Sequence, residues 1–135
     1  MAIQKSLLII LLWVLGASVA RAHDTDSLPA KKKFYYGTAS YYADKFEGRK
    51  TASGEIFSQK KMTAACNVLP LGTWIKVTNL RNGKSVIVKT NDRLHPRMTR
   101  IVDLSRTAAQ QLGYIRSGLT RVKVEVYGKK KPKNT

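Results

Sequence analysis

One carboxyl group, that of Asp92, stands where a predicted β-strand ends. Val86, Val88 and Thr90 precede it at steps of two, so these four side chains share one face of the strand. This face is expected to be the buried one, and partial burial favours the protonated form of a carboxyl group. Such a group can donate a proton to a leaving group. An Asp beside an Asn also caps turns, so the spacing alone leaves a structural role open.

Short strand-like stretches surround this group along the chain. Aromatic, Thr and β-branched residues predict strands at 34–42, 62–65, 74–80, 84–91, 101–104 and 119–127, with a short extended piece at 55–57. Asn82-Gly83 predicts a hairpin turn, because both residue types tolerate positive φ. Ser105 is expected to cap a helix over 106–112 that ends at Gly113. Many short strands with one short helix indicate an all-β domain, a small closed β-barrel.

The N-terminus predicts a secretory signal peptide over residues 1–22. A lysine supplies a positive charge, residues 6–16 are apolar but too few to span a bilayer, and Ala20-Arg21-Ala22 fits a site for cleavage near Ala22. A lipoprotein requires a cysteine at the cleavage point, whereas the only cysteine of this chain is Cys66. The sequence therefore predicts an exported protein, in the periplasm or outside the cell, that is not a lipoprotein.

The rest of the chain is expected to be one basic domain with two basic flanks. We predict a linker at 23–33, a folded domain at 34–128 and a tail at 129–135. The chain has 25 Lys and Arg against 8 Asp and Glu, a net charge of +17. Such charge often indicates nucleic acid, but export argues against that partner and favours an anionic envelope surface reached through the basic flanks. A lone cysteine forms no internal disulfide.

Several short motifs occur in one order along the chain, at 37–42, 51–55, 63–65, 69–73, 77–80, 82–83, 91–93, 101–105 and 112–113. Together they resemble the RlpA family (rare lipoprotein A) over about residues 36–127. The resemblance implies a six-stranded double-psi β-barrel, related more distantly to the expansins. It also implies an endolytic peptidoglycan transglycosylase. Such an enzyme cleaves between N-acetylmuramic acid and N-acetylglucosamine without water, leaves a 1,6-anhydro-muramyl end and prefers glycan stripped of its peptides.

Within this resemblance, Asp92 aligns with the catalytic acid and Glu55 with a second functional carboxylate. The 6-hydroxyl group of the sugar is the nucleophile in this reaction, so no water needs to be positioned. One residue that acts as acid and then as base can therefore suffice. Without the resemblance, Glu55 is interpreted as an exposed loop residue. No cofactor is expected, since the sequence has no Gly-rich phosphate-binding loop.

Two positions depart from the family pattern. Cys66 stands where the family has a functional histidine, and a thiol cannot carry a positive charge. His95 is new in the loop after Asp92, and we hypothesise that it takes the role of the lost histidine while Cys66 packs beneath the cleft. The alternative is an exposed loop histidine. Cys66, His95 and the acidic residues lack the paired spacing of zinc ligands, so no metal site is predicted.

Basic and aromatic side chains near the predicted acid are candidates for substrate binding. Arg93, Arg97 and Arg100 could bind anionic wall groups, or could pair with the acid, which would oppose its role as a proton donor. Tyr41, Tyr42 and Trp74 are candidates for stacking on a sugar ring, although Tyr41 and Tyr42 point to opposite faces of their strand. Trp74, which lies on a strand, is expected instead to pack in the core. Asp103 is predicted to be structural, because it precedes the helix start, where a carboxylate satisfies backbone N–H groups.

Three functions are compatible with these features. The first is a secreted, monomeric peptidoglycan lytic transglycosylase acting on glycan strands, with division-site proteins as candidate partners. The second is a non-catalytic, expansin-like peptidoglycan-binding module, which Cys66 favours. The third is a basic extracellular protein that acts on lipid, which only the charge supports. Binding driven by charge weakens with ionic strength, whereas catalysis leaves anhydro ends at any salt concentration that permits turnover.

Overall fold

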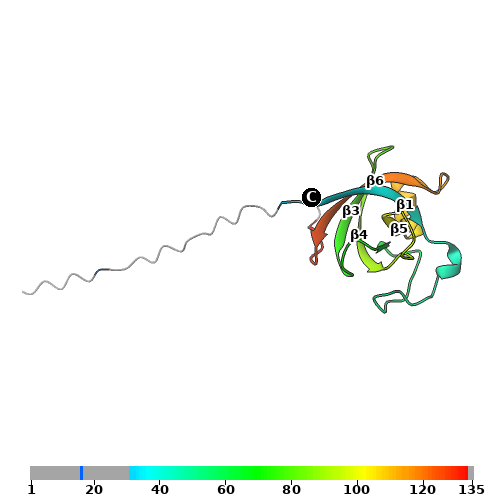
Figure 1. The fold of residues 1–135 in the computed structure, drawn as a ribbon, viewed down its shortest axis with the longest axis horizontal. Coiled ribbons are helices and arrows are strands. Elements are labelled where there is room, and N and C mark those ends of the chain that lie inside the picture. The colour runs from blue at the N-terminus through cyan, green and yellow to red at the C-terminus, as the bar shows by residue number, and fades with distance from the viewer. Residues whose placement is uncertain (1–15, 17–30, 134–135) are drawn as a thin grey trace, which may run out of the picture. The chain divides into compact units, whose positions relative to one another are not determined.

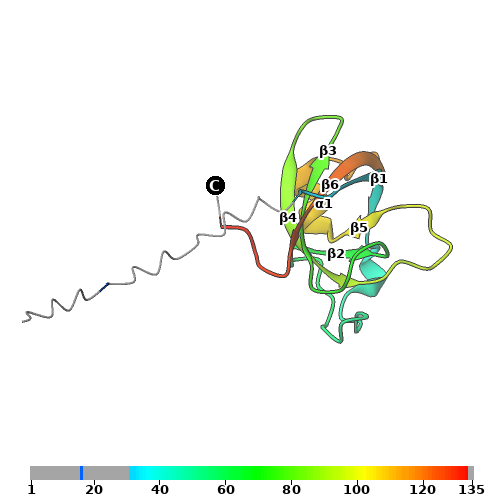
Figure 2. The same ribbon diagram turned by 60° about the vertical axis from the view of Figure 1, so that its left-hand side comes forward.

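Six short segments with alternating apolar residues form strands that close into a barrel (Figures 1 and 2). The computed structural model describes residues 31–133 and Gly16. The strands are β1 (Phe34–Tyr41), β2 (Thr63–Cys66), β3 (Trp74–Asn79), β4 (Ser85–Asp92), β5 (Val102–Leu104) and β6 (Thr120–Gly128). A 3-10 turn, η1 (Asp44–Phe46), follows β1, and the α-helix α1 (Arg106–Leu112) precedes β6.

The strands pair in the order β1-β5-β2-β4-β3-β6, and β6 pairs with β1 to close the barrel. Two pairs are parallel, β1 with β5 and β2 with β4, and the remaining pairs are antiparallel. Parallel neighbours need a long crossover connection, so strands that are distant in the sequence lie side by side. The structure confirms the predicted small six-stranded all-β barrel with one short α-helix.

Alternate residues of the strands fill the inside of the barrel. On β3, Ile75 and Val77 are fully buried, as are alternate valines of β6. Trp74, whose side chain points to the opposite side of β3, is half-buried on the outer surface, where Lys131 Nζ lies 5.4 Å from its ring centroid. The prediction that Trp74 packs in the core is wrong, because its position alternates with those of the core residues.

Short-range sequence signals set the hairpin turn and the ends of the helix. Ser105 Oγ accepts a hydrogen bond from the first turn of α1, and Gly113 ends the helix with a φ of 76°. Between β3 and β4, Gly83 adopts a φ of 73°, whereas Asn82 does not adopt positive φ. The buried Asn79 donates from Nδ2 to the last carbonyl group of α1 over 2.8 Å, which ties the hairpin to the helix.

Two predictions concern segments that the structure does not cover. The predicted signal peptide, residues 1–22, lies outside the described residues apart from Gly16, and so does the predicted linker as far as residue 30. Both stay predictions. Across residues 31–133, the structure contains no helix with the length and hydropathy needed to cross a membrane.

Candidate active site

A row of residues from four neighbouring strands lies in one cleft. Across β1 and β5, Ser40 lies opposite Asp103. On β2, Ala65 lies opposite Asp103 on one side and opposite Asp92 on the other. These residues line a cavity of about 500 Å³. The end of β1 and the loops that follow β1 and β4 complete the lining with Tyr41, Tyr42, Ala43, Lys45, Phe46, Arg93, Leu94, His95, Met98 and Arg100.

The carboxylate of Asp92 accepts three hydrogen bonds. Tyr42 Oη donates to Oδ2 over 2.6 Å. The backbone N–H groups of Ala52 and Arg93 donate to Oδ1 over 2.9 and 2.8 Å. A carboxylate has about four acceptor positions, so one position, on Oδ2, has no donor within the described part of the chain. Asp92 is half-buried and lines the cavity. A proton on the carboxyl group would therefore occupy this open position on Oδ2.

The loop at 51–55 folds over the end of β4 and brings Glu55 close to Asp92. Ser53 N donates to the carbonyl oxygen of Asn91 over 3.1 Å, and Asn91 Nδ2 donates to Glu55 Oε2 over 3.3 Å. Glu55 itself is exposed and does not line the cavity. The structure therefore connects the two carboxylates through Asn91, and they do not face each other across the cleft.

Tyr42 is placed to orient Asp92. Its side chain is only 9% exposed, its ring stacks on Phe57 with the centroids 4.1 Å apart, and Phe46 meets it edge-on at 5.8 Å. Burial, followed by the hydrogen bond to Asp92, raises the pKa of the Tyr42 hydroxyl above its ordinary value. The hydroxyl therefore remains a donor near neutral pH. Because the ring is buried, this geometry favours an orienting role for Tyr42 over the predicted stacking on a sugar.

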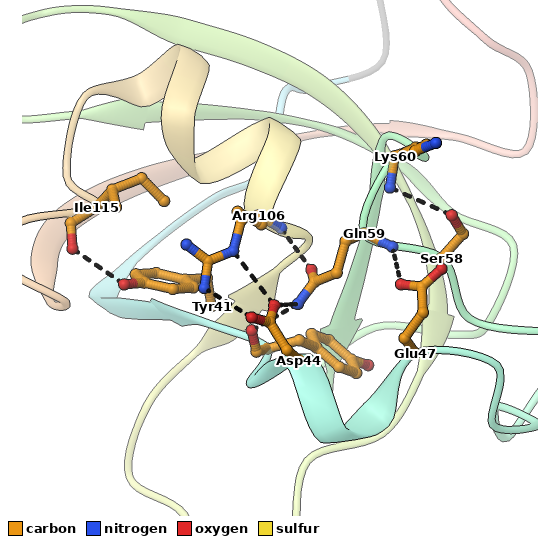
Figure 3. A network of polar contacts seen from close by, with 9 residues as sticks. Tyr41, Asp44, Glu47, Ser58, Gln59, Lys60, Arg106 and Ile115 are labelled. Carbon is orange, nitrogen blue, oxygen red and sulfur yellow. Dashed lines mark hydrogen bonds and ion pairs between the residues drawn. The ribbon is translucent and has the colours of Figure 1, made fainter.

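A polar network centred on Gln59, drawn in Figure 3, fixes the backbone that carries Tyr42. Gln59 Nε2 donates to the Tyr42 carbonyl oxygen over 2.8 Å, and Gln59 Oε1 accepts from Arg106 N at the start of α1 over 2.7 Å. Gln59 N also donates to Glu47 Oε2 over 2.7 Å. Arg106 pairs with Asp44 of η1 at 3.3 Å. The long loop after β1 is thereby tied to α1, which holds the Tyr42 side chain against the cleft.

Asp103 lies in the same cleft and forms an ion pair with Arg100. Arg100 Nε and Nη2 donate to its two carboxylate oxygens over 2.9 and 3.1 Å, and Ser40 Oγ donates to Oδ1 over 2.8 Å. The bond to Asp103 raises the pKa of the Arg100 guanidinium above its ordinary value, so this group stays charged. Asp103 does not cap α1, because Ser105 Oγ accepts the hydrogen bond from the first turn, whereas the Asp103 oxygens accept from Ser40 and Arg100. Asp103 instead neutralises Arg100. The predicted structural role of Asp103 stays a prediction.

His95 and Cys66 lie in different environments. His95 is exposed on the cavity wall, where its Nδ1 accepts from Arg97 N over 3.2 Å, which leaves Nε2 to carry the proton of the neutral ring. Cys66 is fully buried in the barrel core, and burial raises the pKa of its thiol. The replacement of the family's histidine by His95 stays a prediction. Within residues 31–133, no three His, Cys, Asp or Glu side chains gather closely enough to hold a metal ion.

The guanidinium groups of Arg93 and Arg97 do not pair with Asp92 in the structure. The guanidinium of Arg93 donates to the carbonyl oxygens of Cys66 and Leu69, so it ties the end of β2 to the cleft wall. Arg97 is exposed and does not line the cavity. The pairing that would oppose an acid role for Asp92 is therefore absent from the described residues, and substrate binding by either arginine stays a prediction.

Two parts of the cleft could not be found from local sequence patterns. Ser40 and Asp103 are 63 positions apart in the chain, and Ala52 lies 40 positions before Asp92, whose carboxylate accepts from its N–H. The sequence around Ser40 does not indicate that it contacts Asp103, and the sequence around Ala52 does not indicate that it contacts Asp92. The motif at 37–42 is the signal that could have indicated Ser40.

Comparison with known proteins covers most of the barrel. A family model described as "Lytic transglycolase" matches residues 35–124. The endolytic peptidoglycan transglycosylase RlpA of Pseudomonas aeruginosa is 54% identical over 89 residues, which are 66% of this chain and 26% of that protein. The probable endolytic peptidoglycan transglycosylase RlpA of Synechocystis is 45% identical over 108 residues, 80% of this chain and 34% of that protein. The chain thus spans about a quarter to a third of the length of these relatives.

Solved structures confirm the predicted double-psi β-barrel. The Streptomyces papain inhibitor matches with a TM-score of 0.56 and 20% identity, covering 70% of this chain and 94% of the inhibitor. The expansin of Clavibacter michiganensis without ligand matches with a TM-score of 0.57 and 21% identity, covering 76% of this chain and 53% of the expansin. At these identities the likeness shows the fold alone.

Proposed function

This chain belongs to the RlpA family of lytic transglycolases, and we propose that it is itself an endolytic peptidoglycan transglycosylase. The bond cleaved is the one between N-acetylmuramic acid and N-acetylglucosamine in peptide-stripped glycan strands, and a 1,6-anhydro-muramyl end is left. The activity for which the relatives are named supports this proposal, and the region that matches them is the barrel that carries the cleft.

The observation that carries the proposal is the single acceptor position of Asp92 that no donor among residues 31–133 occupies. A proton on this Oδ2 passes to the glycosidic oxygen of the leaving N-acetylglucosamine as its bond to the muramyl C1 breaks. The same oxygen then takes the proton of the 6-hydroxyl group as O6 bonds to C1. Asp92 ends the cycle protonated, and no water is consumed. The three donors hold the carboxyl group in place throughout.

Glu55 and His95 are proposed to assist in different ways. Glu55 accepts from the side chain of Asn91, the residue before Asp92, so we assign it a positioning role. His95 stands on the cavity wall with Nε2 available as a donor, so it can bind a polar group of the sugar. This position would also let it take over the part played by the histidine that Cys66 replaces.

Export to the cell envelope is part of the proposal. The predicted signal peptide at 1–22 would direct export, and a peptidoglycan substrate lies in the envelope. The relatives act on peptidoglycan by name, which is consistent with this location. The monomeric state and contacts with division-site proteins stay predictions.

The test compares Asp92→Asn with a matched carboxylate variant. Asp44→Asn removes the charge of an acid that is 74% exposed on η1, outside the cavity, and the amide oxygen of asparagine can still accept from Arg106 and Gln59. Purified proteins are incubated with intact and peptide-stripped glycan, and soluble products are identified by mass spectrometry. We expect anhydro-muramyl fragments from the wild type and Asp44→Asn, and a loss of about 10²-fold or more for Asp92→Asn. Equal turnover by Asp92→Asn would overturn the assignment of the acid.

The second candidate function is a non-catalytic peptidoglycan-binding module. The buried Cys66 in place of a functional histidine favours it, since an inert thiol supplies neither charge nor a strong donor. In the same experiment, this candidate predicts no anhydro fragments from any variant while the protein still sediments with the glycan.

A further inference from the structure

The outer surface of β1, β6, β3 and β4 joins aromatic and basic side chains in rows. Tyr36 on β1 lies opposite Lys123 on β6. In the next row, Glu125 lies between Phe34 on β1 and Lys76 on β3. These residues alternate with core valines, so their side chains point outward. We call this surface the outer sheet face, defined by Phe34, Tyr36, Trp74, Lys76, Lys123 and Tyr127.

Large aromatic side chains on this face are open to solvent. Tyr36 is 61% exposed, Phe34 45% and Tyr127 38%. Lys123 Nζ lies 5.6 Å from the centroid of the Phe34 ring, so cationic and aromatic groups are interleaved. Exposed aromatic rings of this size usually mark a contact surface, because burying them on a partner releases apolar area from water.

A groove runs beside these aromatic residues. Its volume is about 450 Å³, and Lys76, Tyr127 and Lys131 line it together with residues of β4 and α1. Lys131 also lies over Trp74, so the C-terminal segment adds positive charge to the same face. The groove therefore combines one aromatic side chain, Tyr127, with two cationic ones, Lys76 and Lys131.

Acidic side chains are distributed unevenly over the described residues. Five of the six gather around the cleft and the loop above it: Asp44, Glu47, Glu55, Asp92 and Asp103. The sixth, Glu125, is only 8% exposed and pairs with Lys32 at 2.9 Å. Among residues 31–133, Lys76 and Lys123 have no ion-pair partner. The outer sheet face thus presents positive charge that no acid within residues 31–133 neutralises.

The outer sheet face lies away from the cleft. The cleft is built on β5, β2 and the ends of β1 and β4, and no residue lines both the cleft and the groove. In Figures 1 and 2, β3 and the η1 segment lie on opposite sides of the barrel. One polymer segment can therefore occupy the groove while another occupies the cleft.

We propose that the outer sheet face is a second binding surface for peptide-stripped glycan strands, which rests on the proposed function. Removal of the stem peptides leaves a free carboxylate on each muramic acid, which suits unpaired lysines. Pyranose rings present apolar faces that pack on exposed aromatic rings. Binding at this face holds a long strand near the cleft and raises its effective concentration there, without changing the chemistry on Asp92.

The test uses the full chain with Asp92→Asn, so that the polymer is bound and not cut. The variant Lys76→Gln/Lys123→Gln is compared with Lys50→Gln/Lys60→Gln, which removes the same charge from the exposed loop at the other side of the barrel. Sedimentation with long stripped strands gives the Kd at several salt concentrations. We expect Lys76→Gln/Lys123→Gln to bind roughly fivefold more weakly, and the loop variant to stay within about twofold of the parent.

Further measurements separate this proposal from the proposed function. With Asp92 intact, Lys76→Gln/Lys123→Gln should cut short soluble fragments at the wild-type rate. Tyr36→Ala, at an exposed site that tolerates truncation, should also weaken binding of long strands several-fold. If the wild type makes no anhydro products but the face variants still bind long strands less tightly, the second binding surface is supported and the proposed transglycosylase activity is refuted.

Equal Kd values for the sheet and loop variants overturn the second surface. Tighter binding of single-stranded RNA or of anionic lipid vesicles than of stripped glycan, lost in the same Lys76→Gln/Lys123→Gln variant, overturns glycan as the occupant.

Discussion

The hydrogen bond from Tyr42 to Asp92 can be removed with little change in packing. Tyr42→Phe deletes only the hydroxyl group that donates to Oδ2 over 2.6 Å and keeps the ring stacked on Phe57. Two backbone donors, Ala52 N and Arg93 N, still hold Oδ1. In the variant, Oδ2 of Asp92 can therefore rotate away from its position while the residues that line the cleft stay in place.

The size of the effect follows from this geometry. A hydrogen bond to a charged group contributes about 1.5–3 kcal/mol, and the two remaining donors place Tyr42→Phe at the lower end. A loss of about 1.5 kcal/mol of transition-state stabilisation lowers turnover roughly tenfold. Tyr42 is expected to contact Asp92 and not the substrate, so kcat should fall while KM stays within about twofold. Unfolding in urea should show a destabilisation of about 1.5 kcal/mol.

Tyr114→Phe is the matched control for this substitution. Tyr114 is also a buried tyrosine, its hydroxyl donates to the carbonyl oxygen of Ser40 over 2.7 Å, and it does not line the cavity. We expect a loss of stability of about 1 kcal/mol with an unchanged kcat. The assay is the rate of anhydro-muramyl release from peptide-stripped glycan. A Tyr42→Phe variant with wild-type kcat, or one whose kcat falls no further than that of Tyr114→Phe, refutes the orienting role of Tyr42.

Three further substitutions test other contacts. His95→Ala should leave the unfolding free energy within about 0.5 kcal/mol, since the residue is exposed, but should lower turnover tenfold or more; unchanged turnover would remove His95 from the mechanism. Gly37→Ala should cost about 1–3 kcal/mol in urea unfolding, because its Cβ would lie 2.9 Å from both Cβ and Cγ2 of Ile101. Ile101→Gly removes both atoms, so Gly37→Ala should cost less in that background; an equal cost in both backgrounds contradicts the clash. Burial raises the pKa of the Cys66 thiol above its ordinary value of 9.0, so above that pH the unfolded chain binds fewer protons than the folded one. The buried Tyr42 and Tyr114 lower the unfolding free energy in the same pH range in both proteins. From about pH 9 to about pH 10 the unfolding free energy of the wild type should therefore fall by up to about 1.4 kcal/mol more than that of Cys66→Ala, and an equal fall in both proteins would contradict the raised pKa of the thiol.

Local sequence patterns predicted most of the elements of the fold. Alternation on β3 and β6, the N-cap at Ser105 and the glycine at 113 depend on neighbours within a few residues, and each appears in the structure. The Asp92 position was also predicted, because Val86 and the residues at steps of two after it define a buried face that ends there. Such signals are readable because backbone geometry fixes where neighbouring side chains point.

The assembly of the cleft was decided by the tertiary structure alone. Asp92 and Asp103 share a cavity only because β5 and β4 both pair with β2, one antiparallel and the other parallel. The donors to Asp92 come from Tyr42 and Ala52, which lie 50 and 40 positions away in the chain. Asp103 pairs with Arg100, although the position of Asp103 before the helix predicted that its carboxylate would cap α1. Composition and periodicity identify which residues are buried and which are polar. The register between distant strands determines which of them meet, because that register minimises the free energy of the whole barrel and is not encoded in any single segment.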